Sequence, residues 1–180
     1  MSFFLYKASK AIDTINDSVG KTVSWICLLL VLIVCLDVFL SNAFRYANAA
    51  LFELQWHFFA IIFLLGAGYT LKEDKHVRVD VFYSQFSPTA KAWINFLGTL
   101  LLLLPFCLVL IHAGAAFTEN AWALRERSAD PGGLGGRYLI KGTILLGAIF
   151  LLLQGISILL HSLLIITGKH PTGNSQEIPD

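Results

Sequence analysis

The sequence predicts an all-α membrane protein with four transmembrane helices and both termini in the cytoplasm (N-in/C-in), preceded by an amphipathic interfacial helix. Of the 180 residues, 56% are hydrophobic, and the mean hydropathy of +0.69 is far above that of a soluble domain. Four apolar segments each supply the roughly 20 residues that a helix needs to cross a bilayer. Such continuous runs differ from the alternating segments of about ten residues in a membrane β-barrel.

Residues 1–22 are predicted to form the interfacial helix. Apolar side chains recur there at steps of three and four residues, whereas charged side chains occupy the other positions. The apolar positions are Phe4, Ala8, Ala11, Ile12, Ile15 and Val19, and the charged ones are Lys7, Lys10, Asp13, Asp17 and Lys21. An ordinary solvated N-terminal extension is the alternative interpretation.

Residues 23–167 are predicted to form the four-helix transmembrane domain, with spans at 23–40, 54–71, 92–117 and 139–167. The third span contains Pro105, which we expect to bend its helix. Residues 168–180 are rich in Pro, Gly and polar side chains, and this composition predicts a disordered cytoplasmic tail.

The direction of the spans follows from the 13 Lys and Arg residues, because cytoplasmic loops of membrane proteins are enriched in them. Eight lie on the side that contains both termini: Lys7, Lys10, Lys21, Lys72, Lys75, Arg78, Lys91 and Lys169. Five lie on the other: Arg45, Arg125, Arg127, Arg137 and Lys141. This bias predicts that both termini are cytoplasmic. The expected location is a bacterial inner (cytoplasmic) membrane, which the chain crosses several times.

The middles of the spans lack the polar groups that a transporter uses to hold a solute. By residue count only Gln154 is polar there, although coupled transport needs charged groups or broken helices near the midplane. Motifs of hydrolases, metalloproteases and phosphate-binding loops are also absent. We therefore expect neither an enzyme nor a chain that moves a solute alone, and no cofactor or metal.

Ionisable residues near the span ends allow two interpretations. Asp37 and Glu53 either hydrogen-bond neighbouring groups, for example Asp37 with Arg45, or pair with cationic residues of a partner subunit. His57 and His112 could face each other in a four-helix bundle and ligate a haem iron. A haem-binding or quinone-linked membrane anchor subunit of a redox complex is therefore the alternative function.

Several motifs resemble one family of membrane proteins over residues 5–167. They are Glu53 at the start of the second span, the run Gly66-Ala67-Gly68-Tyr69-Thr70-Leu71, the segment His76-Val77-Arg78-Val79-Asp80, and Arg137-Tyr138-Leu139-Ile140-Lys141-Gly142 before Leu151-Leu152-Leu153-Gln154-Gly155. In this order they are similar to the small integral membrane subunit (DctQ type) of tripartite ATP-independent periplasmic (TRAP) transporters.

The resemblance implies a partner-dependent role in sodium-coupled transport of organic acids, carboxylates above all. In this family a periplasmic solute-binding protein captures the solute, a large transport subunit carries the sodium and substrate sites, and the small subunit braces the large one. The residues expected to serve structure or the partner interface, without catalytic or cofactor-binding roles, are Asp37, Glu53, His76, Arg78, Asp80 and Arg137. In an extended segment His76, Arg78 and Asp80 would share one face.

Overall fold

The computed structural model describes residues 2–73, 83 and 85–168, and regular structure in these ranges is almost entirely helical. A single isolated β-bridge joins Arg127 and Gly135. The predicted all-α class is therefore confirmed. The elements are α1 (Ser2–Phe44), α2 (Ala49–Lys72), α4 (Pro88–Gly98), the π-helical segment η1 (Thr99–Leu103), α5 (Leu104–Ala123) and α6 (Arg137–Ile166).

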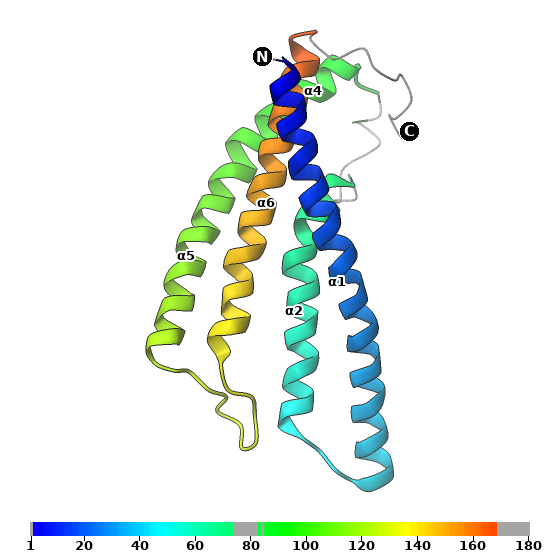
Figure 1. Ribbon diagram of the computed structural model, residues 1–180, viewed down its shortest axis with the longest axis vertical. Helices are drawn as coiled ribbons and strands as arrows, with labels where there is room; N and C mark the ends of the chain where they lie inside the picture. Colours follow the sequence, from blue (N-terminus) through cyan, green and yellow to red (C-terminus); the bar gives the residue numbers. More distant parts are fainter. Residues whose placement is uncertain (1, 74–82, 84, 169–180) are drawn as a thin grey trace.

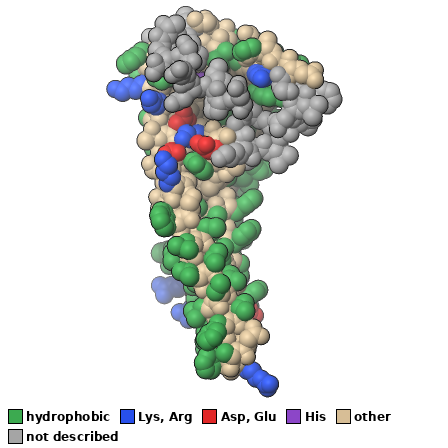
Figure 2. Space-filling view, turned by 90° about the vertical axis from the view of Figure 1, so that its right-hand side faces the viewer, with side chains coloured by type: hydrophobic (Ala, Val, Ile, Leu, Met, Phe, Trp, Pro, Cys, Tyr) green, Lys and Arg blue, Asp and Glu red, His purple; other side chains and the backbone are tan. Residues whose placement is uncertain are grey.

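Four stretches of helix in the described part of the chain are long and apolar enough to cross a membrane, as predicted. They are Phe3–Phe44, Ala49–Lys72, Pro88–Ala123 and Arg137–Ile166. The first three extend beyond the predicted spans at both ends, and the fourth begins two residues before its predicted span and ends one residue before its predicted end. Figure 2 shows hydrophobic side chains along the middle of one face, with charged side chains toward its two ends.

The first helix runs without a break through residue 22, where the sequence analysis placed the end of a separate interfacial helix. α1 has 43 residues, which corresponds to about 64 Å and is more than twice the thickness of a bilayer's hydrocarbon core. Its first half carries buried polar side chains at Ser9 and Asn16. The location of residues 1–22 in the membrane interface stays a prediction.

The long helices lie in the order α5, α6, α2 and α1 across Figure 1. α6 packs on α5 and on α2, α2 packs on α1, and the first half of α1 crosses onto α6. α2 ends partway along the molecule, beside α1. The start of α1, α4 and the end of α6 lie at one end of the molecule, and the connections from α1 to α2 and from α5 to α6 lie at the other. We call these the terminal end and the loop end.

Close approach of α6 to α2 depends on Gly147. A Cβ atom at this position would lie 2.6 Å from the backbone oxygen of Leu64, which is closer than real Cβ atoms come to a backbone atom. Small residues at such crossings let two backbones approach within a membrane. Gly20 has the same role between α1 and the ring of Tyr69 on α2.

Pro105 follows the widened π turn in the third span. Proline has no N–H and its ring clashes with the carbonyl four residues earlier, so it disturbs a regular α-helix. Here the N–H of Leu104 bonds the carbonyl of Thr99 instead, five residues earlier. The turn packs on α6, where Thr99 and Leu103 lie against Gly155. The structure thus has a π segment directly before Pro105, and the predicted bend stays a prediction.

Candidate functional site: two buried polar clusters

Glu53 of α2 is the centre of a polar cluster at the loop end. Only 2% of this residue is exposed, and its carboxylate accepts three hydrogen bonds from the α5–α6 connection and the start of α6. The donors are the Ser128 hydroxyl, the Leu134 backbone N–H at 2.6 Å and the Arg137 guanidinium at 3.2 Å. We call Glu53, Ser128, Leu134 and Arg137 the latch.

The connection from α5 to α6 is folded so that its donors converge on the Glu53 carboxylate. The Ser128 N–H bonds the Leu134 carbonyl at 3.0 Å, and the Arg137 N–H bonds the Glu126 carbonyl at 3.2 Å. Gly136 has a φ of 73°, in the left-handed region that glycine adopts at low cost, and it turns the chain into α6. The latch therefore holds an ordered loop against α2.

Electrostatics explain why Glu53 and Arg137 stabilise each other. Arg137 is the first residue of α6, where the positive end of the helix dipole disfavours a cation. The Glu53 carboxylate offsets that cost, and Arg137 supplies a counter-charge that a buried carboxylate needs. The guanidinium also lies over the Trp56 ring, 5.8 Å from its centroid.

A second ion pair stabilises the same connection. The ammonium of Lys141 on α6 lies 2.5 Å from the Glu126 carboxylate and 3.8 Å from the centroid of the Phe117 ring on α5. Lys141 thereby joins the start of α6 to the loop through Glu126 and to α5 through Phe117.

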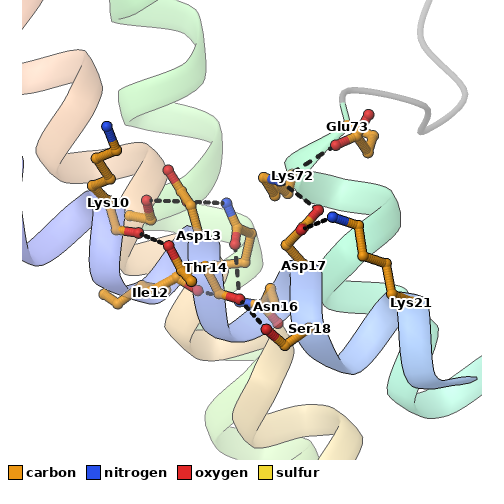
Figure 3. A network of polar contacts seen from close by, with 12 residues as sticks. Lys10, Ile12, Asp13, Thr14, Asn16, Asp17, Ser18, Lys21, Lys72 and Glu73 are labelled. Atoms are coloured by element: carbon orange, nitrogen blue, oxygen red, sulfur yellow. Dashed lines mark hydrogen bonds and ion pairs between the residues drawn. The ribbon is translucent and has the colours of Figure 1, made fainter.

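The second polar cluster joins the first half of α1 to the second half of α6 (Figure 3). It consists of Ser9, Asp13, Asn16, Gln154 and Ser157, which we call the polar clamp. The Asn16 amide donates to the Gln154 side-chain oxygen at 2.9 Å, and the Gln154 amide donates to Asp13 at 2.9 Å. The Ser157 hydroxyl also donates to Asp13, at 2.7 Å, and Ser9 and Ser157 share a bond of 2.9 Å.

The hydrogen bonds of the polar clamp end on the Asp13 carboxylate. Both the Gln154 amide and the Ser157 hydroxyl donate to the same Asp13 oxygen. Ser9, Asn16, Gln154 and Ser157 are each at most 3% exposed. Interhelical hydrogen bonds of this kind stabilise helix packing in membranes, so the clamp fixes the first half of α1 on α6.

Beside the polar clamp, Asp17 joins α1 to α2. Lys72 donates to Asp17 at 3.0 Å and Lys21 pairs with it at 2.5 Å, and Figure 3 shows both ammonium groups converging on this carboxylate. Asn16 packs against Gly68, where a Cβ atom would collide with its side-chain oxygen. The end of α2 is thus held on α1 by charge and by close contact.

Of the predicted site residues, the structure brings Glu53 and Arg137 together. Asp37 accepts a hydrogen bond from Gln55 of α2 at 2.7 Å, so a neighbouring helix, rather than the suggested Arg45, supplies its partner. His76, Arg78 and Asp80 lie outside the described residues. A role of these residues in binding a partner subunit stays a prediction.

The two histidines considered as haem ligands are on separate helices that are not neighbours. His57 is on α2 and His112 is on α5, and α6 lies between these helices (Figure 1). The His57 ring nitrogen Nδ1 bonds the Glu53 carbonyl oxygen of its own helix at 2.6 Å. Within residues 2–73, 83 and 85–168, no three His, Cys, Asp or Glu side chains are grouped as metal ligands would be.

Sequence reasoning missed Ser128 and the Leu134 N–H in the latch, and Ser9, Asn16 and Ser157 in the polar clamp. Asp13 was assigned to the charged face of the first helix, but its carboxylate bonds α6. One signal pointed to the clamp: Gln154 was noted as the polar residue in the middle of its span. A buried amide needs polar partners, and Asn16 is a polar residue on the apolar side of α1.

The comparison with known proteins identifies one matching family. Residues 30–164, well over half of the chain, match the family described as "Tripartite ATP-independent periplasmic transporters, DctQ component". No curated protein matches the chain.

Proposed function

The chain belongs to the DctQ component family of TRAP transporters, and we propose that it braces the large transport subunit of a sodium-coupled, binding-protein-dependent transporter for organic acids. Membership confirms the resemblance of its motifs, and it makes the chain a multi-pass membrane subunit of a transporter and not an enzyme. The bracing role, the sodium coupling, the substrate class and the partners of this particular chain belong to the proposal.

One observation carries the bracing role: polar side chains of the latch and of the polar clamp bond to one another between helices. Glu53 holds the α5–α6 connection, and Asp13, Asn16 and Gln154 hold α1 on α6. A subunit that bound the solute would instead need polar groups directed at a solute site near the midplane. Side chains that fix the positions of helices suit a rigid support for a moving partner.

The proposed topology is N-in/C-in, with the terminal end in the cytoplasm. Support comes from the start of α1 and the end of α6, which lie at the same end of the molecule (Figure 1), and from the sequence, in which the segments predicted to be cytoplasmic contain eight of the 13 Lys and Arg residues. The loop end then faces the periplasmic solute-binding protein. In the same proposal His76, Arg78 and Asp80 contact the large subunit from the cytoplasmic side.

The test of this function is transport with and without the chain. The large subunit and the solute-binding protein are reconstituted in liposomes, and uptake of a labelled carboxylate is measured under an inward sodium gradient. We expect uptake only when this chain is present, together with near-stoichiometric copurification of the large subunit. Uptake by the chain alone, or unchanged uptake without it, would overturn the proposal.

Two variants separate bracing from general folding. Arg78→Ala and Asp80→Ala are expected to reduce copurification of the large subunit while this chain remains folded. Glu119→Ala is the control, because Glu119 is an exposed acid at the loop end. Equal copurification in the Arg78, Asp80 and Glu119 variants would exclude Arg78 and Asp80 from the interface.

A further inference from the structure

Lys7 and Lys10, near the start of α1, do not pair with Asp13, the nearest acidic residue of the same helix. Lys10 and Asp13 are three residues apart, a spacing at which side chains on a helix can pair. However, Asp13 bonds Gln154 and Ser157 on α6, and in Figure 3 the Lys10 ammonium extends away from this network. In the described part of the chain, neither Lys7 nor Lys10 forms an ion pair, and both are exposed.

Aromatic rings are exposed next to these lysines. Phe3 is 72% exposed and Phe4 is 74% exposed, although they are separated from Lys7 by only about one helical turn. Exposed aromatic rings beside cations are typical of helix surfaces that lie at the boundary between lipid headgroups and acyl chains. In water, the same exposure would carry a hydrophobic cost.

The packing of α1 on α6 places Lys7 and Lys10 beside an apolar part of α6. Ser9 bonds Ser157, and the two helices run in opposite directions (Figure 1). Lys7 lies about 3 Å beyond Ser9 along α1, whereas α6 continues about 13 Å beyond Ser157 to Ile166. Lys7 and Lys10 are thus level with a mostly apolar part of α6, from which the flexible lysine stem can extend the ammonium to the headgroup layer.

From this arrangement we propose that Lys7 and Lys10 bind the phosphate of an anionic phospholipid, while Phe3 and Phe4 contact its acyl chains. The inward orientation of Asp13 makes the site possible, because it removes the carboxylate that would otherwise compete for Lys10. A membrane lipid is favoured over a soluble anion because the exposed rings have no use in binding a free phosphate. The site goes beyond the bracing role and does not depend on the transported solute.

Lipid binding is measured on the full-length chain by native mass spectrometry in detergent, with phosphatidylglycerol and phosphatidylcholine added in equal amounts. We expect the wild type to bind phosphatidylglycerol preferentially. Because each lysine near an anionic surface contributes about a fivefold factor, Lys7→Gln/Lys10→Gln should lower the apparent affinity for phosphatidylglycerol on the order of twentyfold. Phosphatidylcholine binding should stay unchanged.

The matched control is Arg125→Gln/Arg127→Gln, which removes the same charge from two exposed residues at the loop end. It should retain the preference for phosphatidylglycerol, as should Lys7→Arg/Lys10→Arg. Equal loss in the loop-end control, or no loss in Lys7→Gln/Lys10→Gln, would overturn the proposal. Displacement of the lipid by millimolar inorganic phosphate would do so too, because it would identify a site for a free anion. Failure of the bracing role would appear separately, as lost copurification with normal lipid binding.

Discussion

The carboxylate of Glu53 accepts the backbone N–H of Leu134 at 2.6 Å, across 81 residues of sequence. It also accepts the Ser128 hydroxyl and the Arg137 guanidinium. One buried side chain on α2 therefore determines where the α5–α6 connection lies. Replacement by alanine would leave these three donors without the acceptor that now satisfies them.

Glu53→Ala is therefore expected to release the connection. We expect backbone N–H exchange at Leu134 to accelerate about tenfold or more, because local opening governs exchange, and the Tm in detergent to fall on the order of 5 °C. Hydrogen–deuterium exchange of peptides from residues 126–137 and thermal unfolding measure the two effects. Glu119→Ala removes the same charge from an exposed site and should change neither. Unchanged exchange at Leu134 would contradict the role assigned to Glu53.

The contact between α2 and α6 at Gly147 gives a second prediction. Gly147→Ala should lower the free energy of unfolding by about 1–3 kcal/mol, because its Cβ would lie 2.6 Å from the Leu64 carbonyl oxygen and push the helices apart. Gly66→Ala is the matched control, since no atom lies within 4 Å of a Cβ there. Alanine should be neutral or stabilising at Gly66 because it favours helix more than glycine does. Equal effects at the two positions would argue against close packing at Gly147.

The lengths of the apolar runs were sufficient to predict the four candidate spans, because the thickness of the bilayer determines how many apolar residues a spanning helix needs. Pro105 predicted a bend in the third span, because it cannot donate a backbone hydrogen bond, but it did not predict the π segment that precedes it. The continuity of α1 was not predictable. An amphipathic pattern and an apolar run can follow each other on one helix, and Gly20 near the predicted boundary does not end α1 but packs against the Tyr69 ring of α2.

The candidate site was predictable only in part. Glu53 was chosen as an acid at the start of a span and Arg137 as part of a motif that resembles the family, but their pairing across 84 residues depends on how α2 and α6 pack. The periodicity of the first helix placed Asp13 among the solvated charges, because it does not reveal a polar partner on another helix. Gln154 was noticed for its polarity, yet only the packing of α1 on α6 identifies Asp13 and Asn16 as its partners.

The polar clamp predicts energetic coupling between Asn16 and Gln154. In a double-mutant cycle with Asn16→Ala and Gln154→Ala, we expect a coupling free energy of about 0.5–1.5 kcal/mol, because the Asn16 amide donates to Gln154 at 2.9 Å. Chemical unfolding in detergent measures it. Thr14→Ala combined with Gln154→Ala should show no coupling, since the Thr14 hydroxyl bonds the Lys10 carbonyl of its own helix. Additive effects of Asn16→Ala and Gln154→Ala would contradict the clamp.

The proposed topology predicts opposite accessibility of two engineered cysteines. Asp130 is exposed in the connection between α5 and α6, and Thr89 is exposed in the first turn of α4 at the terminal end. In a background with Cys27, Cys35 and Cys107 replaced by alanine, a membrane-impermeant maleimide should label Asp130→Cys in intact cells. Thr89→Cys should be labelled only after the inner membrane is permeabilised. The reverse pattern would place the terminal end in the periplasm and would also contradict the orientation inferred from the Lys and Arg residues.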